Sequence, residues 1–156
     1  MANPTIKDAL GKLGEGMFEV ALTDFQLFPR PLFDAHHLDG KCPNVDFLVV
    51  MSGARGIFFV QVKTTKDPLT ASSIAVQLTK DQRNGLAQMP GPTYLAGVYA
   101  PTRRCFIRSI DQSSQAGITS IPLKYELNPA NLQILYNEVQ RYWARRTDKP
   151  QPSAFA

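Results

Sequence analysis

The sequence predicts an α/β fold in which a mixed central sheet is covered by helices on both sides. Three observations support this fold class: an amphipathic helix near the N-terminus, apolar strands joined by short turns, and a capped amphipathic helix near the C-terminus. The 156 residues are enough for one domain with its own core. We expect residues 1–146 to form a single domain and residues 147–156 (TDKPQPSAFA) to be a loosely ordered tail.

The first predicted helix covers about residues 6–25. Thr5 can cap its start, and Asp8 follows at the spacing of a capping box. One face of this helix is apolar and consists of Ile6, Leu10, Leu13, Met17, Val20 and Ala21. Phe18 and Leu22 extend the apolar surface around one flank, which predicts that the helix packs on more than one side.

Apolar runs bounded by turn residues predict the strands. They cover residues 31–36, 45–51, 56–64, 73–78, 93–100 and 104–110. Residues 52–56 form a short glycine-containing hairpin loop between the second and third strands. Because these strands are rich in valine, phenylalanine and isoleucine, we expect the sheet to be buried on both faces.

Two further helices are predicted. Residues 79–89 form a short polar helix with Thr79 as its N-cap. The last helix is capped by Asn128, begins at Pro129 and runs to about Arg146. Its apolar face consists of Leu132, Leu135, Tyr136, Val139 and Trp143.

The composition is that of a globular protein without a membrane span. Hydrophobic residues make up 44% and charged residues 19%, and the longest apolar runs are only strand-sized. The N-terminus lacks the pattern of a signal peptide, and the two cysteines, Cys42 and Cys105, suit reduced thiols, so we expect a cytoplasmic protein. The net charge of +4 permits binding to a polyanion without demonstrating it.

Three polar residues lie on the two strands that the hairpin joins. Asp46 is at the start of an apolar strand, where a carboxylate must be paired, hydrated or bound to a cation. Gln61 and Lys63 are two residues apart, so their side chains point to the same face of the next strand. Pairing of the strands brings all three to the open end of the hairpin. Taken alone, Asp46 and Lys63 could also form an ordinary ion pair at the strand edge.

This group of residues suits the hydrolysis of a phosphodiester. That reaction uses a hard cation, usually Mg²⁺ with Mn²⁺ as a substitute, held by carboxylates, carbonyl oxygens and waters. Asp46 would be the principal ligand and the side-chain carbonyl of Gln61 a neutral second ligand. Lys63 would stabilise the attacking hydroxide or the charge that develops on phosphorus.

The same residues resemble the motif of a known superfamily. Asp46, followed by fourteen residues and then Gln61-Val62-Lys63, is similar to the D…(D/E/Q)-x-K core of the PD-(D/E)XK nucleases. Residues 11–15 (GKLGE) resemble the G-x-x-G-E helix of Holliday-junction-resolvase-like members. Residues 61–65 (QVKTT) resemble a strand of an uncharacterised, resolvase-like branch, to which Mrr-like proteins are related. The resemblance covers residues 6–110. It implies a restriction-endonuclease-like three-layer α/β/α fold with an αβββαβ core.

The resemblance also implies an activity and partners. It implies Mg²⁺-dependent endonuclease cleavage of DNA, including branched or structured DNA, by a homodimer that acts in restriction, repair, recombination or a mobile element. Glu15 on the first helix would be a further acidic residue and metal ligand. Glu19, one turn later, is the alternative, but Glu15 borders the apolar flank whereas Glu19 lies on the polar side.

The sequence departs from the family pattern at two positions. Val45 stands where the motif has proline, and Gln61 stands where it usually has an acid. An amide lacks the negative charge, so the metal affinity should fall unless Glu15 compensates. One alternative is therefore a catalytically inert module of the same fold that binds nucleic acid or protein. Another is an unrelated α/β enzyme for small substrates, which would need a deep apolar pocket.

Other residues could extend the site. His36 and His37 precede Asp39, and each could reach the site or bind substrate, although loop histidines more often do neither. Residues 141–146 (RYWARR) interleave arginines with aromatic side chains, a pattern typical of phosphate contact and base stacking. The aromatic side chains could instead pack on the core, and this is the interpretation we favour for Trp143.

Overall fold

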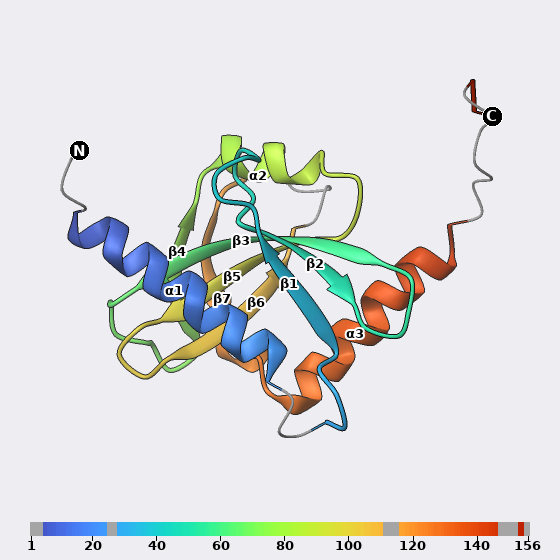
Figure 1. Ribbon diagram of the computed structural model, residues 1–156. Helices are drawn as coiled ribbons and strands as arrows, with labels where there is room; N and C mark the ends of the chain where they lie inside the picture. The colour runs from blue at the N-terminus through green and yellow to red at the C-terminus, as the bar shows by residue number, and fades with distance from the viewer. Residues whose placement is uncertain (1–4, 25–27, 111–115, 147–152, 155–156) are drawn as a thin grey trace.

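A five-stranded mixed sheet forms the middle of the molecule (Figure 1). The computed structural model describes residues 5–24, 28–110, 116–146 and 153–154. The strands, in spatial order, are β1 (Phe33–His37), β2 (Phe47–Met51), β3 (Ile57–Thr65), β5 (Thr93–Tyr99) and β6 (Arg104–Ser109). Only β3 and β5 pair in parallel, and the other neighbours are antiparallel. The expected mixed α/β fold is confirmed.

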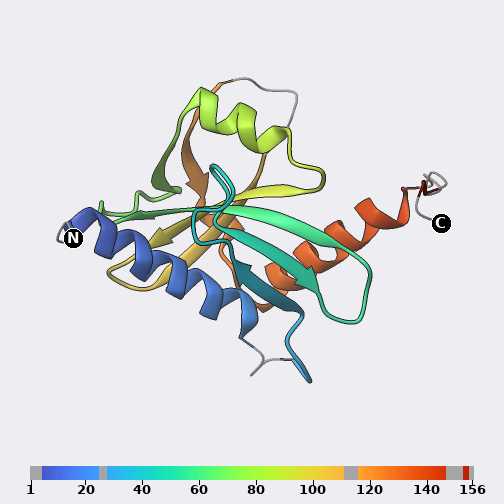
Figure 2. The same ribbon diagram turned by 45° about the horizontal axis from the view of Figure 1, so that its top comes forward.

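Two helices cover one face of the sheet. They are α1 (Ile6–Thr23) and α3 (Pro129–Ala144), and Figure 2 shows both on the same side. Their interface with the sheet contains Phe18 and Leu22 of α1, Leu132, Leu135 and Val139 of α3, and Phe33, Phe47, Val49, Phe58 and Val60 of the strands. This apolar burial supplies the main driving force for assembling the layer.

The opposite face is covered by a second, smaller sheet together with a helix. β4 (Ser73–Leu78) pairs antiparallel with β7 (Ile118–Pro122), and α2 (Lys80–Ala87) follows β4. A 3-10 helix, η1 (Leu123–Tyr125), follows β7. This layer packs Ile74, Leu78, Leu86, Ile118 and Ile121 against Leu95 and Phe106 of the central sheet. Helices therefore lie on both sides, as expected, but β7 was not predicted.

The expected capping residues are confirmed. Thr5 and Asp8 form a reciprocal capping box, and Thr79 forms another with Gln82 at the start of α2. Asn128 caps α3, whose first residue is proline as predicted. No helix among the described residues is long and apolar enough to cross a membrane. Most of the expected tail, residues 147–152 and 155–156, lies outside the described part of the chain.

The core-facing side of α1 was predicted wrongly. Ile6, Leu13 and Val20 were expected in the core, but their exposed fractions are 78%, 50% and 69%. The buried residues are Gly14, Phe18 and Leu22. The prediction used only the spacing of apolar residues, which ignores glycine. Because Gly14 has no side chain, the face of α1 that contains it can come closest to the sheet.

Candidate active site

The backbone of Asp46 is part of the sheet hydrogen-bonding pattern although it precedes β2. Its N–H donates to the Val60 carbonyl oxygen at 2.9 Å, and its own carbonyl accepts from the Leu38 N–H at 2.9 Å. Asp46 is thus fixed between the ends of β1 and β3. A site built on paired strands holds its side chains in place more closely than one built on a loop.

The Asp46 carboxylate receives two neutral donors from β3. Its Oδ2 accepts from Gln61 Nε2 at 2.9 Å and from the backbone N–H of Val62 at 2.7 Å. The same Gln61 nitrogen lies 3.4 Å from the Val62 carbonyl oxygen. The predicted convergence of Asp46 and Gln61 at the open end of the β2–β3 hairpin is therefore present in the structure.

Burial makes the negative charge of Asp46 less favourable. Desolvation raises the pKa of Asp46, and the nearby charge of Glu15 raises it further. The Val62 N–H and the charges of His37 and Lys63 act in the opposite direction, but the pKa remains above its usual value. This half-buried carboxylate would gain from a bound cation.

Lys63 lies beside this carboxylate without being bound to it. Its pKa is lowered by desolvation and by the charge of Lys7, against the effect of Asp46, which raises it. The four ion pairs among the described residues do not include Lys63. The alternative in which Asp46 and Lys63 form an ordinary strand-edge ion pair is therefore not what the structure shows.

Glu15 joins the site through a histidine. Its Oε2 lies 2.6 Å from His37 Nε2, and Nδ1 of the same ring lies 2.6 Å from Asp39 Oδ1. Burial alone lowers the pKa of His37, but the hydrogen bonds with Asp39 and Glu15 and their charges raise it above its usual value. The two ring nitrogens of His37 face one carboxylate each, so a single imidazole links Glu15 to Asp39.

Two other candidates, His36 and Glu19, lie outside this group of residues. His36 pairs with the exposed Asp34 at 3.1 Å. Glu19 is exposed, whereas the charge of Glu15 is among the causes that raise the pKa of Asp46. Because strand residues alternate between faces, adjacent histidines on β1 have different surroundings.

Gly14 places Glu15 next to the sheet. A Cβ atom at Gly14 would lie 1.7 Å from Thr64 Oγ1, so only glycine allows α1 to approach β3 this closely. Thr64 is adjacent to Lys63 and its buried hydroxyl has no hydrogen-bond partner among the described residues. The G-x-x-G-E run thus has a geometric role, since its second glycine brings the acid that follows it to the site.

The oxygen atoms at the site are compatible with a hard cation. Two carboxylates, Asp46 and Glu15, and one amide oxygen, from Gln61, match the ligands that Mg²⁺ takes when it keeps several waters. In the structure, Gln61 Nε2 faces Asp46. The side-chain amide would have to rotate by about half a turn to direct its oxygen at a cation beside Asp46. In the described part of the chain, no three His, Cys, Asp or Glu side chains gather where they could hold a metal ion. The residues fit a weakly held Mg²⁺ better than a tightly held transition metal.

The C-terminal arginines are remote from this site. Trp143 Nε1 donates to the Ile57 carbonyl oxygen at 2.8 Å, next to the β2–β3 turn and therefore at the opposite end of the hairpin from Asp46. The favoured packing of Trp143 against the rest of the domain is confirmed. Arg146 lies over the ring of Tyr142, 4.9 Å from its centroid.

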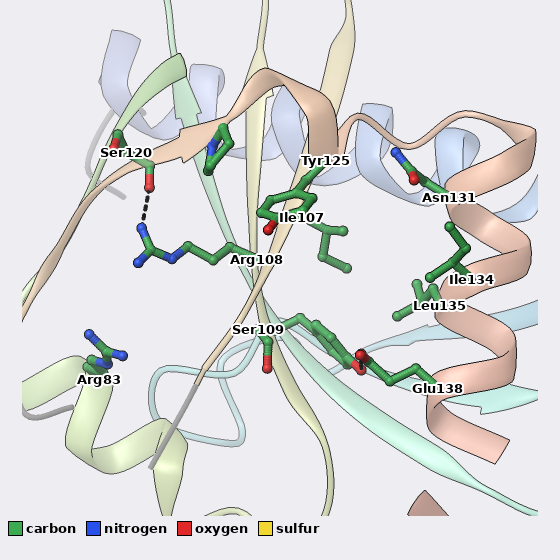
Figure 3. A pocket seen from close by; sticks show the side chains of 12 residues that line it. Arg83, Ile107, Arg108, Ser109, Ser120, Tyr125, Asn131, Ile134, Leu135 and Glu138 are labelled. Atoms are coloured by element: carbon green, nitrogen blue, oxygen red, sulfur yellow. Dashed lines mark hydrogen bonds between the residues drawn. The ribbon is translucent and has the colours of Figure 1, made fainter. Parts of the chain in front are cut away.

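A separate cavity of about 600 Å³ lies between β6, β7 and α3 (Figure 3). Arg83 and Arg108 line one side, and each donates to a backbone carbonyl oxygen, that of Ala116 at 2.8 Å and that of Ser120 at 2.9 Å. Ile134 and Leu135 of α3 line the other side. Arg108 ties β7 to β6 of the central sheet, and Arg83 ties Ala116, which precedes β7, to α2. The mixture of charged and apolar residues differs from the deep apolar pocket that a small-substrate enzyme would need.

The comparisons with known proteins show a likeness to solved structures. No family model matches the chain, and no curated protein matches it in sequence. Among solved structures, the chain is similar to a nuclease from a fusselovirus, with a TM-score of 0.49, 11% sequence identity, and coverage of 92% of this chain and 96% of that chain. At this identity the function must be inferred from the site itself.

Proposed function

We propose that this chain is a Mg²⁺-dependent DNA endonuclease that hydrolyses phosphodiester bonds at Asp46, Gln61 and Lys63, with Glu15 as a further acidic residue. One observation carries the proposal. Among the described residues, the half-buried carboxylate of Asp46 is hydrogen-bonded only by neutral N–H groups, while the ammonium group of Lys63 lies nearby without an ion pair. In a structural ion pair, the carboxylate and the ammonium group contact each other directly. In a hydrolytic site, the carboxylate is left to bind the cation and the ammonium group to bind the phosphate.

Asp46, Gln61 and Glu15 would hold the cation. Bound Mg²⁺ would polarise the phosphate and lower the pKa of a coordinated water. Asp46 would supply the principal oxygen ligand, and Gln61 would turn its amide to add a neutral one. Since Gln61 brings no negative charge, the second negative charge at the site would come from Glu15.

Lys63 would act on the substrate. Its ammonium group would donate hydrogen bonds to the attacking oxygen or to the phosphate oxygens, on which negative charge increases in the transition state. The lowered pKa of Lys63 makes its proton easier to share than that of an exposed lysine. Lys7 also lowers the pKa of Lys63, and its positive charge would add to the attraction for a DNA backbone.

His37 would position Glu15. The short contact between them, 2.6 Å, fixes the orientation of the carboxylate, and Asp39 fixes the ring from its other nitrogen. Such support of a ligand by neighbouring hydrogen bonds is common at metal sites.

The test is DNA cleavage by purified protein in Mg²⁺ and in Mn²⁺. We expect Asp46→Asn and Lys63→Met each to lower the cleavage rate by about a thousandfold or more. Matched controls are Asp34→Asn and Lys41→Met, which change an exposed acid and an exposed lysine outside the site and should leave the rate unchanged. Activity that survives both site substitutions would exclude this assignment.

A second candidate is a catalytically inert module with the same fold. The hydrogen bond from Gln61 to Asp46 supports it, because the pair is satisfied without any cation. This candidate predicts DNA binding that weakens as salt increases, with no turnover in any divalent metal. Measured cleavage that depends on Asp46 would decide against it.

A further inference from the structure

The outer face of α1 carries a line of exposed apolar side chains. Ile6, Leu13 and Val20 are spaced seven residues apart and are three of the five large hydrophobic residues described as exposed. Ala9 and Gly16 lie between them and are exposed as well. We call these five residues the outer stripe. It lies opposite Gly14, Phe18 and Leu22, which face the sheet, so α1 is apolar on both sides.

This pattern is the one that a helix uses to pack against another helix. Residues that repeat at alternating spacings of three and four form a continuous seam along a helix. If this face of α1 were exposed only to water, its apolar side chains would contribute no free energy of burial. The expectation that α1 packs on more than one side is therefore unmet among the described residues of a single copy.

We infer that a second copy of this chain covers the outer stripe, with the two α1 helices antiparallel. The sizes of the side chains fit this arrangement. When one helix is reversed end for end about a point near residues 14–15, Leu13 meets Gly16 of the partner subunit, and Val20 meets Ala9 of the partner subunit. Leu13 and Val20 thus each face a small residue, which lets the helices approach closely.

The charges beside the stripe fit the same arrangement. Lys12 and Glu19 are both exposed, flank the stripe on the same side, and take part in none of the ion pairs among the described residues. The antiparallel arrangement brings Lys12 next to Glu19 of the partner subunit, and the two-fold axis repeats this pair. A parallel arrangement would instead set Lys12 beside the apolar flank that contains Met17. Charge complementarity therefore favours a second copy in the antiparallel orientation.

The arrangement leaves the candidate active site open. Glu15 faces His37 on β1, on the flank of α1 away from the stripe. Two copies would present two sites related by a two-fold axis, which suits action on both strands of a duplex. The association itself depends only on α1 and holds whether or not the nuclease proposal is correct.

The first test is the mass of the protein in solution, measured by sedimentation velocity over a range of concentrations. We expect a dimer for the natural chain. Leu13→Glu should weaken the dimer by about a hundredfold or more, because it places a charge in the apolar seam. The matched control is Ile134→Glu, since Ile134 is 59% exposed but lies on α3, outside the stripe. Thermal unfolding checks that both variants fold.

The second test concerns the orientation of the helices. Lys12→Glu should weaken the dimer by about tenfold, because it places two acids side by side in each pair. Adding Glu19→Lys to the same chain should restore the dimer, because it recreates the pairs with reversed sign. A monomer at all concentrations, a dimer indifferent to Leu13→Glu, or a failure of Glu19→Lys to restore association would each overturn the inference.

Discussion

Asp46, beside β3, and Glu126, beside β6 at the edge of the sheet, are both partly buried acids with different partners. Glu126 accepts two hydrogen bonds from the guanidinium of Arg104, at 2.8 and 2.9 Å. These hydrogen bonds lower the pKa of Glu126. Asp46 accepts only from an amide and a backbone N–H, and burial raises its pKa.

The difference separates an acid with an ion-pair partner from an acid that is held only by neutral donors. The charge of Glu126 is neutralised within the protein, so nothing further needs to bind there. The charge of Asp46 is only partly compensated, and a cation from solution would complete it. A carboxylate that accepts hydrogen bonds but has no ion-pair partner among the described residues is therefore a better guide to a site than burial alone.

The largest effect on the Asp46 region should come from Gly14. Gly14→Ala places a methyl group where Thr64 lies, so α1 must move away from β3. We expect a loss of about 2–3 kcal/mol in the free energy of unfolding, measured in denaturant. The control is Gly11→Ala, where no atom lies within 4 Å of the new Cβ. It should stabilise the helix by about 0.5–1 kcal/mol, and equal losses in both variants would contradict the close approach at Gly14.

The next effect concerns the missing negative charge at position 61. Gln61→Glu puts a second acid beside Asp46 and should raise the affinity for Mg²⁺ by about tenfold. The measurement is the rise in melting temperature as Mg²⁺ is added, which does not depend on activity. Unchanged Mg²⁺ affinity would show that Gln61 does not face the cation. Asp34→Asn serves as the control and should not alter the response.

Neutralising each acid should change stability in opposite directions. Without added metal, Asp46→Asn should stabilise the fold by about 1 kcal/mol, because the amide oxygen keeps both hydrogen bonds without a buried charge. Glu126→Gln should destabilise it by about 0.5–1 kcal/mol, because Arg104 loses its counterion. Urea unfolding of both variants tests the comparison, and changes of the same sign would refute it.

The smallest effect is the pH dependence of the Arg104–Glu126 pair. The pKa of Glu126 is lower in the folded chain than its ordinary value of 4.5. Its contribution is therefore present above pH 4.5 and is lost as the pH falls through the folded value. Because both side chains are about one-third exposed, the loss should stay below about 1 kcal/mol. In unfolding measurements from about pH 6 to about pH 3, the Glu126→Gln variant should lack this part of the loss in the free energy of unfolding.

The sequence predicted the β2–β3 hairpin and the meeting of Asp46 with Gln61 because both depend on local rules. Strand alternation sets which side chains share a face, and a short loop sets the register. The helix starts at Ile6, Lys80 and Pro129 were predictable for a similar reason, because each depends on a capping side chain within three residues.

The rest depends on contacts between distant segments. The rotation of α1 is set by Gly14 against Thr64, and hydrophobic periodicity contains no information on that contact. β7 is a short run, residues 118–122, that becomes a strand only because β4 lies beside it. The contact of His37 with Glu15 joins a strand to a helix, so the sequence could name the histidine only as one of several candidates.

The position of β3 in the sheet has a consequence for folding and solubility. β3 lies between β2, which pairs with it through a hairpin, and β5, which pairs with it in parallel and joins from a distant segment. Until β5 arrives, β3 has a free edge formed by an apolar run that includes Phe58, Phe59 and Val60, a segment prone to aggregate. Gln61 and Lys63 interrupt that run as gatekeepers against aggregation. Lys63 would therefore limit aggregation of the folding chain whether or not it takes part in catalysis.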